Sequence, residues 1–147
     1  MFVMDSLALI PEVTNYIKSM GPRLIGTDKV YYVARCFRNE TTTDSMRLKE
    51  FTQIGVELLG PNALDCRKVV RKDAINLFKK LLPDDSWILQ DGVERGLNLY
   101  DDSGKAFEIS STDNSTSKQI LGGGPYNGGA GWAFGLERLM AANHGKL

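Results

Sequence analysis

Cysteine, histidine and long apolar runs are all scarce in this sequence. Two cysteines and one histidine occur among 147 residues, and neither cysteine has the spacing of a metal ligand or of a disulfide framework. No run approaches the roughly 18 apolar residues of a membrane-spanning helix, and no basic residue precedes the short apolar stretch at the start. The composition therefore argues against secretion and membrane insertion, and we expect a protein of the reducing cytoplasm.

Net charge and glycine-rich phosphate loops are also missing. The sequence carries 18 Lys or Arg and 18 Asp or Glu, so nothing in its overall balance attracts nucleic acid or an anionic membrane. It contains neither GxxxxGK[ST] nor a GxGxxG that follows a strand. Any nucleotide site must therefore take its positive charge from side chains, and arginine is well suited to that.

The hydrophobic residues, 42% of the chain, suffice for a core, and we expect a single domain over 1–147. Residues 11–20 predict a short helix that ends at the Gly-Pro pair. Residues 29–40 and 47–60 are rich in β-branched and aromatic residues on either side of the polar tract TTTDSM, which predicts an antiparallel hairpin.

Residues 61–82 predict the clearest helix, with one apolar stripe that should cover the hairpin. We interpret the basic residues on its outer surface as a solvated face: Arg67, Lys68, Arg71, Lys72, Lys79 and Lys80. Further strands are expected at 86–89, 95–100 and 105–111, and after the glycine cluster LGGGPYNGGAG the end of the chain reads as a strand that turns into a helix. The pattern predicts an α+β fold, an antiparallel sheet flanked by helices.

Strand periodicity divides the second strand of the hairpin into two faces. Leu48, Ile54, Val56 and Leu58 share one face, and the other face carries Arg47, Lys49, Phe51, Gln53 and Glu57. Arg38 and Glu40 are two residues apart on the first strand, so their side chains also share one face. Guanidinium groups can bind phosphates, an aromatic ring can stack on a base, and the carboxylates can accept bonds from amino groups. An exposed face with cross-strand ion pairs explains this pattern equally well.

Two segments are specific enough to indicate a family. CFRNE followed by RLKEFTQIGVE resembles motif 2 of the class II aminoacyl-tRNA synthetases, and GWAFGLERLM resembles their motif 3. LIPEVT, RGLNLYD and GGGPYNG are similar to the LRPE-x-T, RGLDYY and GGGRYD segments of histidyl-tRNA synthetases, while FEISS and GAGWAFGLERL are more weakly similar to pyrrolysyl and seryl enzymes. The chain therefore resembles a class II catalytic core, closest to the histidyl type.

The resemblance implies a site for ATP and a site for an amino acid. Arg38 would hold the α-phosphate, Phe51 would stack on adenine with Glu40 at its edge, and Arg47 and Arg138 would bind the outer phosphates. The amino acid would be surrounded by Glu12, Thr14, Gln53 and Glu57 at its ammonium group, Arg95 at its carboxylate and Tyr100 at its side chain.

The reaction that this implies is attack of the amino-acid carboxylate on the α-phosphorus of ATP, which releases pyrophosphate and leaves an aminoacyl adenylate. Arg38 and Arg95 are the expected catalytic residues, because the task is to orient two anions and to stabilise their charge. The cofactor would be Mg²⁺, held by the phosphates and by Glu108.

Departures from the family pattern leave three functions open. The sequence shows no motif 1, insertion domain or anticodon-binding domain, and Ile10, Leu99, Pro125 and Asn127 replace residues of the histidyl segments. The first function is an adenylate-forming enzyme, whose acceptor is a tRNA or a small carrier. The second is a non-catalytic paralogue that binds an amino acid or nucleotide and regulates a partner, and the third is a piece of a longer synthetase. A homodimer and a complex with a partner chain both stay open.

Overall fold

The computed structural model describes residues 3–4, 7–20, 28–39, 41, 47–94, 105–113 and 119–143. Its strands are β1 (Val3–Met4), β2 (Leu7–Ala8), β3 (Lys29–Phe37), β4 (Glu50–Leu59), β5 (Trp87–Val93), β6 (Ala106–Ser111), β7 (Gln119–Tyr126) and β8 (Gly129–Gly135). Its helices are α1 (Thr14–Met20), α2 (Ala63–Leu81) and α3 (Leu136–Ala142).

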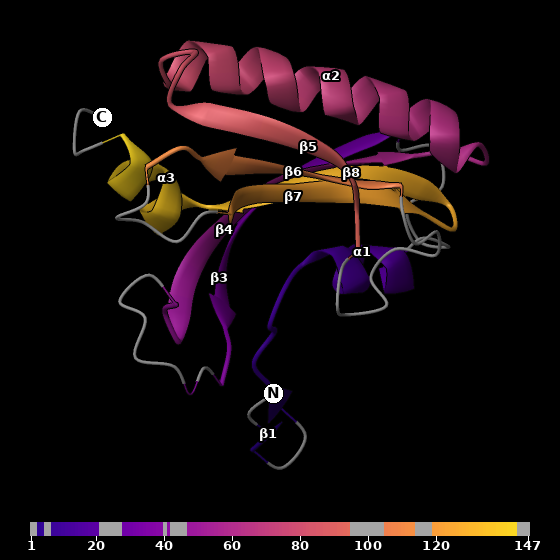
Figure 1. Ribbon diagram of the computed structural model, residues 1–147. Coiled ribbons are helices and arrows are strands. Elements are labelled where there is room, and N and C mark those ends of the chain that lie inside the picture. Colours follow the sequence, from indigo (N-terminus) through magenta and orange to yellow (C-terminus); the bar gives the residue numbers. More distant parts are fainter. Residues whose placement is uncertain are drawn as a thin grey trace.

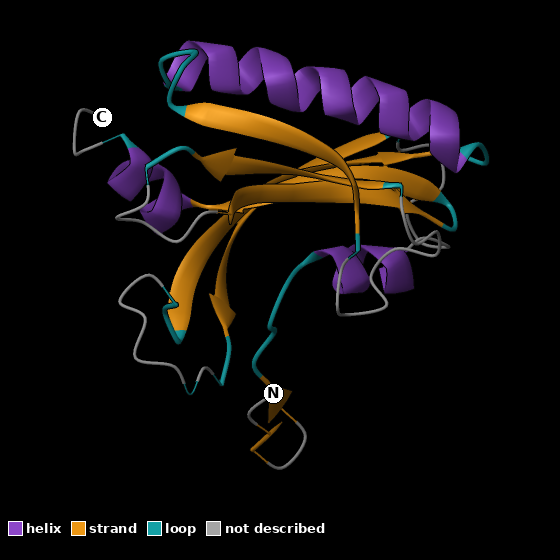
Figure 2. Ribbon diagram, viewed as in Figure 1, coloured by secondary structure: helices purple, strands orange, loops and turns teal. Residues whose placement is uncertain are grey.

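Six of the strands form one sheet in the order β3-β4-β8-β7-β6-β5, and each neighbouring pair is antiparallel. The long helix α2 lies along one face of this sheet and α1 lies on the opposite side (Figure 1). Figure 2 shows the resulting layers of helix, sheet and helix. The predicted α+β fold with an antiparallel sheet flanked by helices is confirmed.

The predicted hairpin is present, although its second strand starts later than expected. β3 and β4 pair in continuous register from Lys29–Leu58 to Phe37–Glu50. Arg47 and Lys49 lie in bends ahead of β4, so the predicted start of this strand at residue 47 is wrong. One more backbone bond follows the last pair of the ladder, from the N–H of Arg38 to the carbonyl oxygen of Lys49 at 2.8 Å. The predicted strand at 95–100 lies outside the described residues.

α2 forms where predicted because its ends are capped and its apolar stripe is continuous. The Asn62 side chain accepts a bond from the backbone N–H of Asp65 at 3.3 Å, which marks the start of the helix. Val70, Ala74 and Phe78 are completely buried against the sheet. No helix in the described part of the chain is long and apolar enough to cross a membrane.

The glycine cluster forms a buried hairpin rather than a flexible one. β7 and β8 pair from Leu121–Phe134 to Tyr126–Gly129, and the positive φ of 96° at Gly128 permits the tight turn between them. Trp132 and Phe134 face α2 and are buried in the core. A Cβ at Gly123 would lie 2.5 Å from the Phe107 ring, so this glycine lets the ring pack against the strand.

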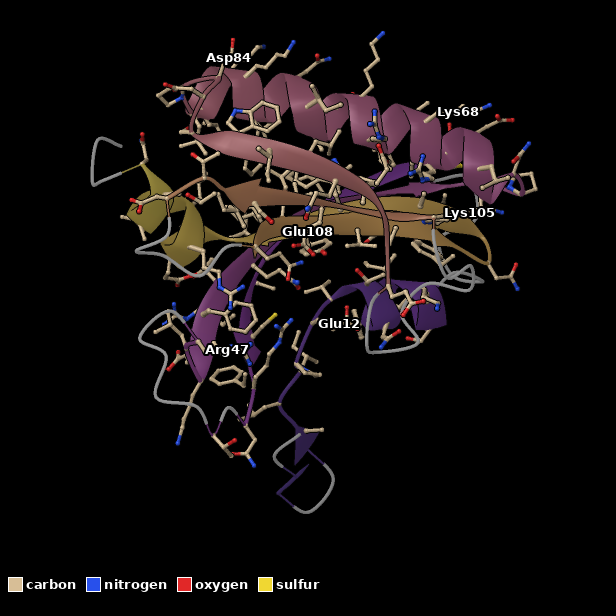
Figure 3. The ribbon with its side chains drawn as sticks, in the orientation of Figure 1. Glu12, Arg47, Lys68, Asp84, Lys105 and Glu108 are labelled. Carbon is tan, nitrogen blue, oxygen red and sulfur yellow. The ribbon has the colours of Figure 1, made fainter. Side chains whose placement is uncertain are left out.

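Two of the basic residues of α2 point to the sheet edge instead of to solvent. Arg67 and Arg71 both bond the carboxylate of Asp91 on β5, with the Arg67 bond at 2.7 Å. Their guanidinium groups hold the pKa of Asp91 below its ordinary value, Arg71 having the larger effect. For these two residues the interpretation as a solvated face is wrong, whereas the exposed Lys68 fits it (Figure 3).

Candidate functional site

β4 carries three of the predicted site residues on one face. Phe51, Gln53 and Glu57 point away from α2, because side chains alternate along a strand and the intervening Ile54 and Val56 pack into the core on the α2 side. The division into two faces that the sequence predicted is therefore present. Gln53 and Glu57 are buried although both are polar, so each needs hydrogen-bond partners.

Glu57 is completely buried and its two carboxylate oxygens have separate donors. The Thr14 hydroxyl donates to Oε1 at 2.8 Å and the Tyr126 hydroxyl donates to Oε2 at 2.9 Å. Burial raises the pKa of Glu57 to about 7, although the bonds from Thr14 and Tyr126 lower it, and the nearby Glu12 carboxylate raises it further. The site thus holds a carboxyl group that titrates near neutral pH and can pair with a cation when it is ionised.

Glycine in β8 makes this arrangement possible. Gly131 stands opposite Glu57 in the β4–β8 ladder, and a Cβ on it would lie 1.8 Å from the Oε2 atom of Glu57. Tyr126 comes from β7, on the far side of β8, and reaches Glu57 across this backbone. The absence of a side chain at Gly131 therefore lets two strands that are not neighbours share one polar cluster.

The segment that leads into α1 covers the same cluster, on the side of the sheet opposite α2 (Figure 1). The backbone N–H of Val13 donates to Oε1 of Gln53 at 2.9 Å. The same oxygen accepts from the Cys36 thiol at 3.5 Å, and burial raises the pKa of Cys36 to about 11, which keeps this thiol protonated. The Glu12 carboxylate accepts from the backbone N–H of Asn15 at 3.0 Å at the start of the helix. All four residues predicted around the ammonium group, Glu12, Thr14, Gln53 and Glu57, are buried together here.

The other end of the same face carries an arginine over an aromatic ring. The guanidinium carbon of Arg38 lies 4.8 Å from the centre of the Phe51 ring, within the range of a cation–π contact. Arg38 follows the last residue of β3 and donates from Nε to the carbonyl oxygen of Pro11 at 3.1 Å. The positive charge is therefore fixed between Phe51 and the N-terminal segment that leads into α1.

Arg138, in the first turn of α3, and Phe51 lie on either side of one glycine. A Cβ at Gly135 would lie 4.0 Å both from Cγ of Arg138 and from a ring carbon of Phe51, so both side chains flank this glycine. The Arg138 guanidinium donates to the carbonyl oxygen of Gln119 at 3.1 Å. The sheet thus brings together two arginines and a ring, from the first hairpin and the last helix.

The remaining predicted residues are less closely gathered. Arg47 is exposed ahead of β4, and Figure 3 shows it with Glu12 on the opposite side of the molecule from Lys68. Glu108 on β6 stands opposite Gly122 and shares the site face, where it accepts a bond from the Ser110 hydroxyl at 3.0 Å. Among the described residues no group of three acidic, histidine or cysteine side chains could hold a metal. Glu40, Arg95 and Tyr100 lie outside the described residues.

Two residues of the site are not predicted by the sequence. Tyr126 lies in the glycine-rich segment GGGPYNG, and nothing in that segment indicates that its hydroxyl reaches Glu57, 69 residues away. The carboxylate of Glu137 accepts a bond from the backbone N–H of Thr52 at 2.9 Å, and the motif GLERL by itself does not indicate this contact. A tyrosine beside glycines that are buried in a sheet is the signal that could have indicated the first contact.

Comparison with known proteins identifies the family of this chain. The family described as tRNA synthetases class II (D, K and N) matches residues 23–119, which is well over half of the chain. The chain therefore belongs to the class II tRNA synthetases, as the resemblance of its motifs predicted. An aspartate–tRNA ligase of Buchnera aphidicola is 37% identical over 57 residues, which are 39% of this chain and 10% of that protein.

Solved structures confirm the fold. The pyrrolysyl-tRNA synthetase PylSc of Desulfitobacterium hafniense has a TM-score of 0.71 and 17% identity over 98% of this chain and 53% of that one. The histidyl-tRNA synthetase of S. aureus, in its apo form, has a TM-score of 0.64 and 20% identity over 93% of this chain and 52% of that one. The chain thus spans about half the length of these synthetases and a tenth of the aspartate–tRNA ligase. The relatives include aspartyl, pyrrolysyl and histidyl enzymes, so they do not select one amino acid.

Proposed function

We propose that this chain forms an aminoacyl adenylate from ATP and an amino acid, as the activating part of a class II synthetase of the cytoplasm. The observation that carries the proposal is the order of side chains along β4. A ring with an arginine above it lies at one end, and a buried cluster of carboxylates, an amide and hydroxyls lies at the other. A base with phosphates suits the first end, and an ammonium group suits the second.

At the nucleotide end, Phe51 would stack on adenine and Arg38 would move from the ring face to the α-phosphate. Arg138 and Arg47 would bind the outer phosphates. The position of Arg138 near the N-terminus of α3 supports this role, because the helix dipole adds to the attraction for phosphate.

At the other end, Glu57 and Glu12 would bind the ammonium group, with Gln53 and Thr14 completing its hydrogen bonds. The amino-acid carboxylate then forms a bond to the α-phosphorus of ATP while the bond to the β-phosphate oxygen breaks and pyrophosphate leaves. Arg38 would stabilise the charge between these anions together with Arg95. Tyr100 would lie near the amino-acid side chain.

Mg²⁺ suits the residues that are present, since it commonly binds one or two carboxylates together with substrate phosphates. Glu108 would supply one carboxylate on the site face of the sheet, where it accepts a bond from the Ser110 hydroxyl at 3.0 Å. When bound, the ion would neutralise charge on the phosphates.

Amino-acid-dependent exchange of pyrophosphate into ATP, screened over all twenty amino acids, tests the proposal. We expect exchange with at least one amino acid, and a Glu57→Gln variant should lose amino-acid affinity while it keeps its affinity for ATP. Exchange with one amino acid only would define the substrate, and a strict preference for histidine would support the histidyl type. Binding of ATP or of an amino acid without any exchange would favour the second candidate, a non-catalytic binding module that acts with a partner. Transfer to tRNA is a separate proposal, to be tested with total tRNA.

A further inference from the structure

Where the β4–β8 ladder ends, the side chain of Glu137 accepts the next hydrogen bond in place of a backbone carbonyl. The last backbone pair joins Gln53 with Gly135, after which the chain leaves the sheet and enters α3. The next amide along β4, that of Thr52, donates to both carboxylate oxygens of Glu137, at 2.9 and 3.0 Å. Glu137 therefore ties the first turn of α3 to the strand between the two ends of the site.

This tie matters because α3 has little that fixes it locally. The helix has seven residues and its N-cap, Gly135, makes no side-chain capping bond. A helix of this length is not stable on its own, so its position depends on contacts with the sheet. Arg138 follows Glu137 directly. The side chain of Arg138 and the Phe51 ring both lie next to Gly135.

The ion pairs around Glu137 do not account for its placement. Arg35 lies 2.8 Å from Glu50 but 3.9 Å from Glu137, and more than half of the Arg35 side chain is exposed. Exposed pairs of this kind contribute little. Of the contacts that Glu137 makes with the described residues, the two bonds from the partly buried Thr52 amide are therefore the ones that hold it in position.

We propose that Glu137 is a positioning residue for the nucleotide, because it holds the first turn of α3, which carries Arg138, at the Phe51 end of β4 so that one ligand can touch the ring and the arginine together. This inference rests on the proposed function and deepens it. It predicts a specific loss for ligands that carry outer phosphates. AMP, which lacks them, should be affected little.

The experiment measures the affinities of ATP with Mg²⁺ and of AMP by calorimetry for wild type, Glu137→Ala, Glu137→Gln and Glu50→Gln. Glu137→Ala should weaken ATP binding by roughly tenfold to a hundredfold, the usual scale for a misplaced binding group, and should change AMP affinity less than about twofold. Glu137→Gln should retain most of the ATP affinity, since its amide oxygen can still accept from Thr52. Glu50→Gln is the matched control, because it removes a carboxylate that also pairs with Arg35, at 2.8 Å, and leaves the bonds from Thr52 to Glu137 in place.

The outcomes separate this inference from the function on which it rests. If wild type does not bind ATP, both fall. If wild type binds ATP and Glu137→Ala binds it equally well, or loses AMP affinity to the same extent, only the positioning role falls. Should the alanine variant fail to fold, Glu137→Asp keeps the charge but is one methylene too short to reach Thr52, and it must then show the same selective loss of ATP affinity.

Discussion

Glu57 gives the site a testable pH dependence. Burial raises its pKa from 4.5 to about 7. The pKa in the folded protein lies above the unfolded value, so the folded state binds more protons between these two pH values. The stability that this carboxyl contributes is therefore fully present below about pH 4.5 and is lost as the pH rises through about 7. The difference between the two pKa values corresponds to roughly 3 kcal/mol of unfolding free energy.

A Glu57→Gln variant isolates this contribution. Glutamine has nearly the same shape and does not titrate, so acid effects from other residues cancel when the variant is compared with wild type. Between pH 5 and pH 8 the wild type should lose roughly 2 to 3 kcal/mol of unfolding free energy relative to the variant. Urea denaturation followed by tryptophan fluorescence at both pH values measures the difference, since Trp132 lies in the core.

Parallel behaviour of the two proteins from pH 5 to pH 8 would refute the reasoning, because it would mean that Glu57 has the same pKa in the folded and unfolded chain. The same titration should appear in ligand binding. Only the ionised carboxylate attracts an ammonium group, so wild-type affinity for the amino acid should rise as the pH passes about 7, whereas the affinity for ATP should not follow this titration.

Three further predictions concern single side chains. Gly131→Ala should lower the unfolding free energy by about 3 kcal/mol, because its Cβ overpacks the site and breaks the bonds to Glu57. Gly135→Ala should cost far less, because its Cβ has room, with the nearest side-chain atoms at 4.0 Å. Thermal unfolding compares the two variants, and equal losses of stability would contradict the packing argument. Asn62→Ala should cost about 1 kcal/mol through the lost helix cap, and a change below about 0.3 kcal/mol in urea denaturation would show that the cap is dispensable. Arg95→Ala should lower the rate of pyrophosphate exchange with little change in ATP affinity, while Arg138→Ala should weaken ATP binding; a variant of Arg95 with wild-type exchange would remove it from the reaction.

Periodicity explains why the site face could be predicted from sequence. Successive side chains of a strand point to opposite faces whatever their neighbours are, so the shared parity of Phe51, Gln53 and Glu57 placed them together without knowledge of the fold. In the helix the period of 3.6 residues per turn predicted one apolar stripe, in which Val70, Ala74 and Phe78 are buried. These inferences required only local geometry.

Contacts that depend on strand order could not be predicted in this way. The pairing of Arg67 and Arg71 with Asp91 requires β5 to lie at the sheet edge beneath α2, and no pattern within the helix specifies that. The bond between Tyr126 and Glu57 requires β8 to lie between their strands with glycine at the crossing point. Both contacts are properties of the register and order of the sheet.

One strand, β4, also sets the distance between the two ends of the proposed ligand site. Phe51 and Glu57 are six residues apart on β4, which separates their Cα atoms by roughly 20 Å. Inserting or deleting one residue between them would turn one of the two side chains onto the α2 face. The number of residues between Phe51 and Glu57 is therefore constrained as long as both side chains bind the ligand. Evolution toward a different amino acid would instead act on α1 and β7, which contact the Glu57 end and leave the spacing along β4 unchanged.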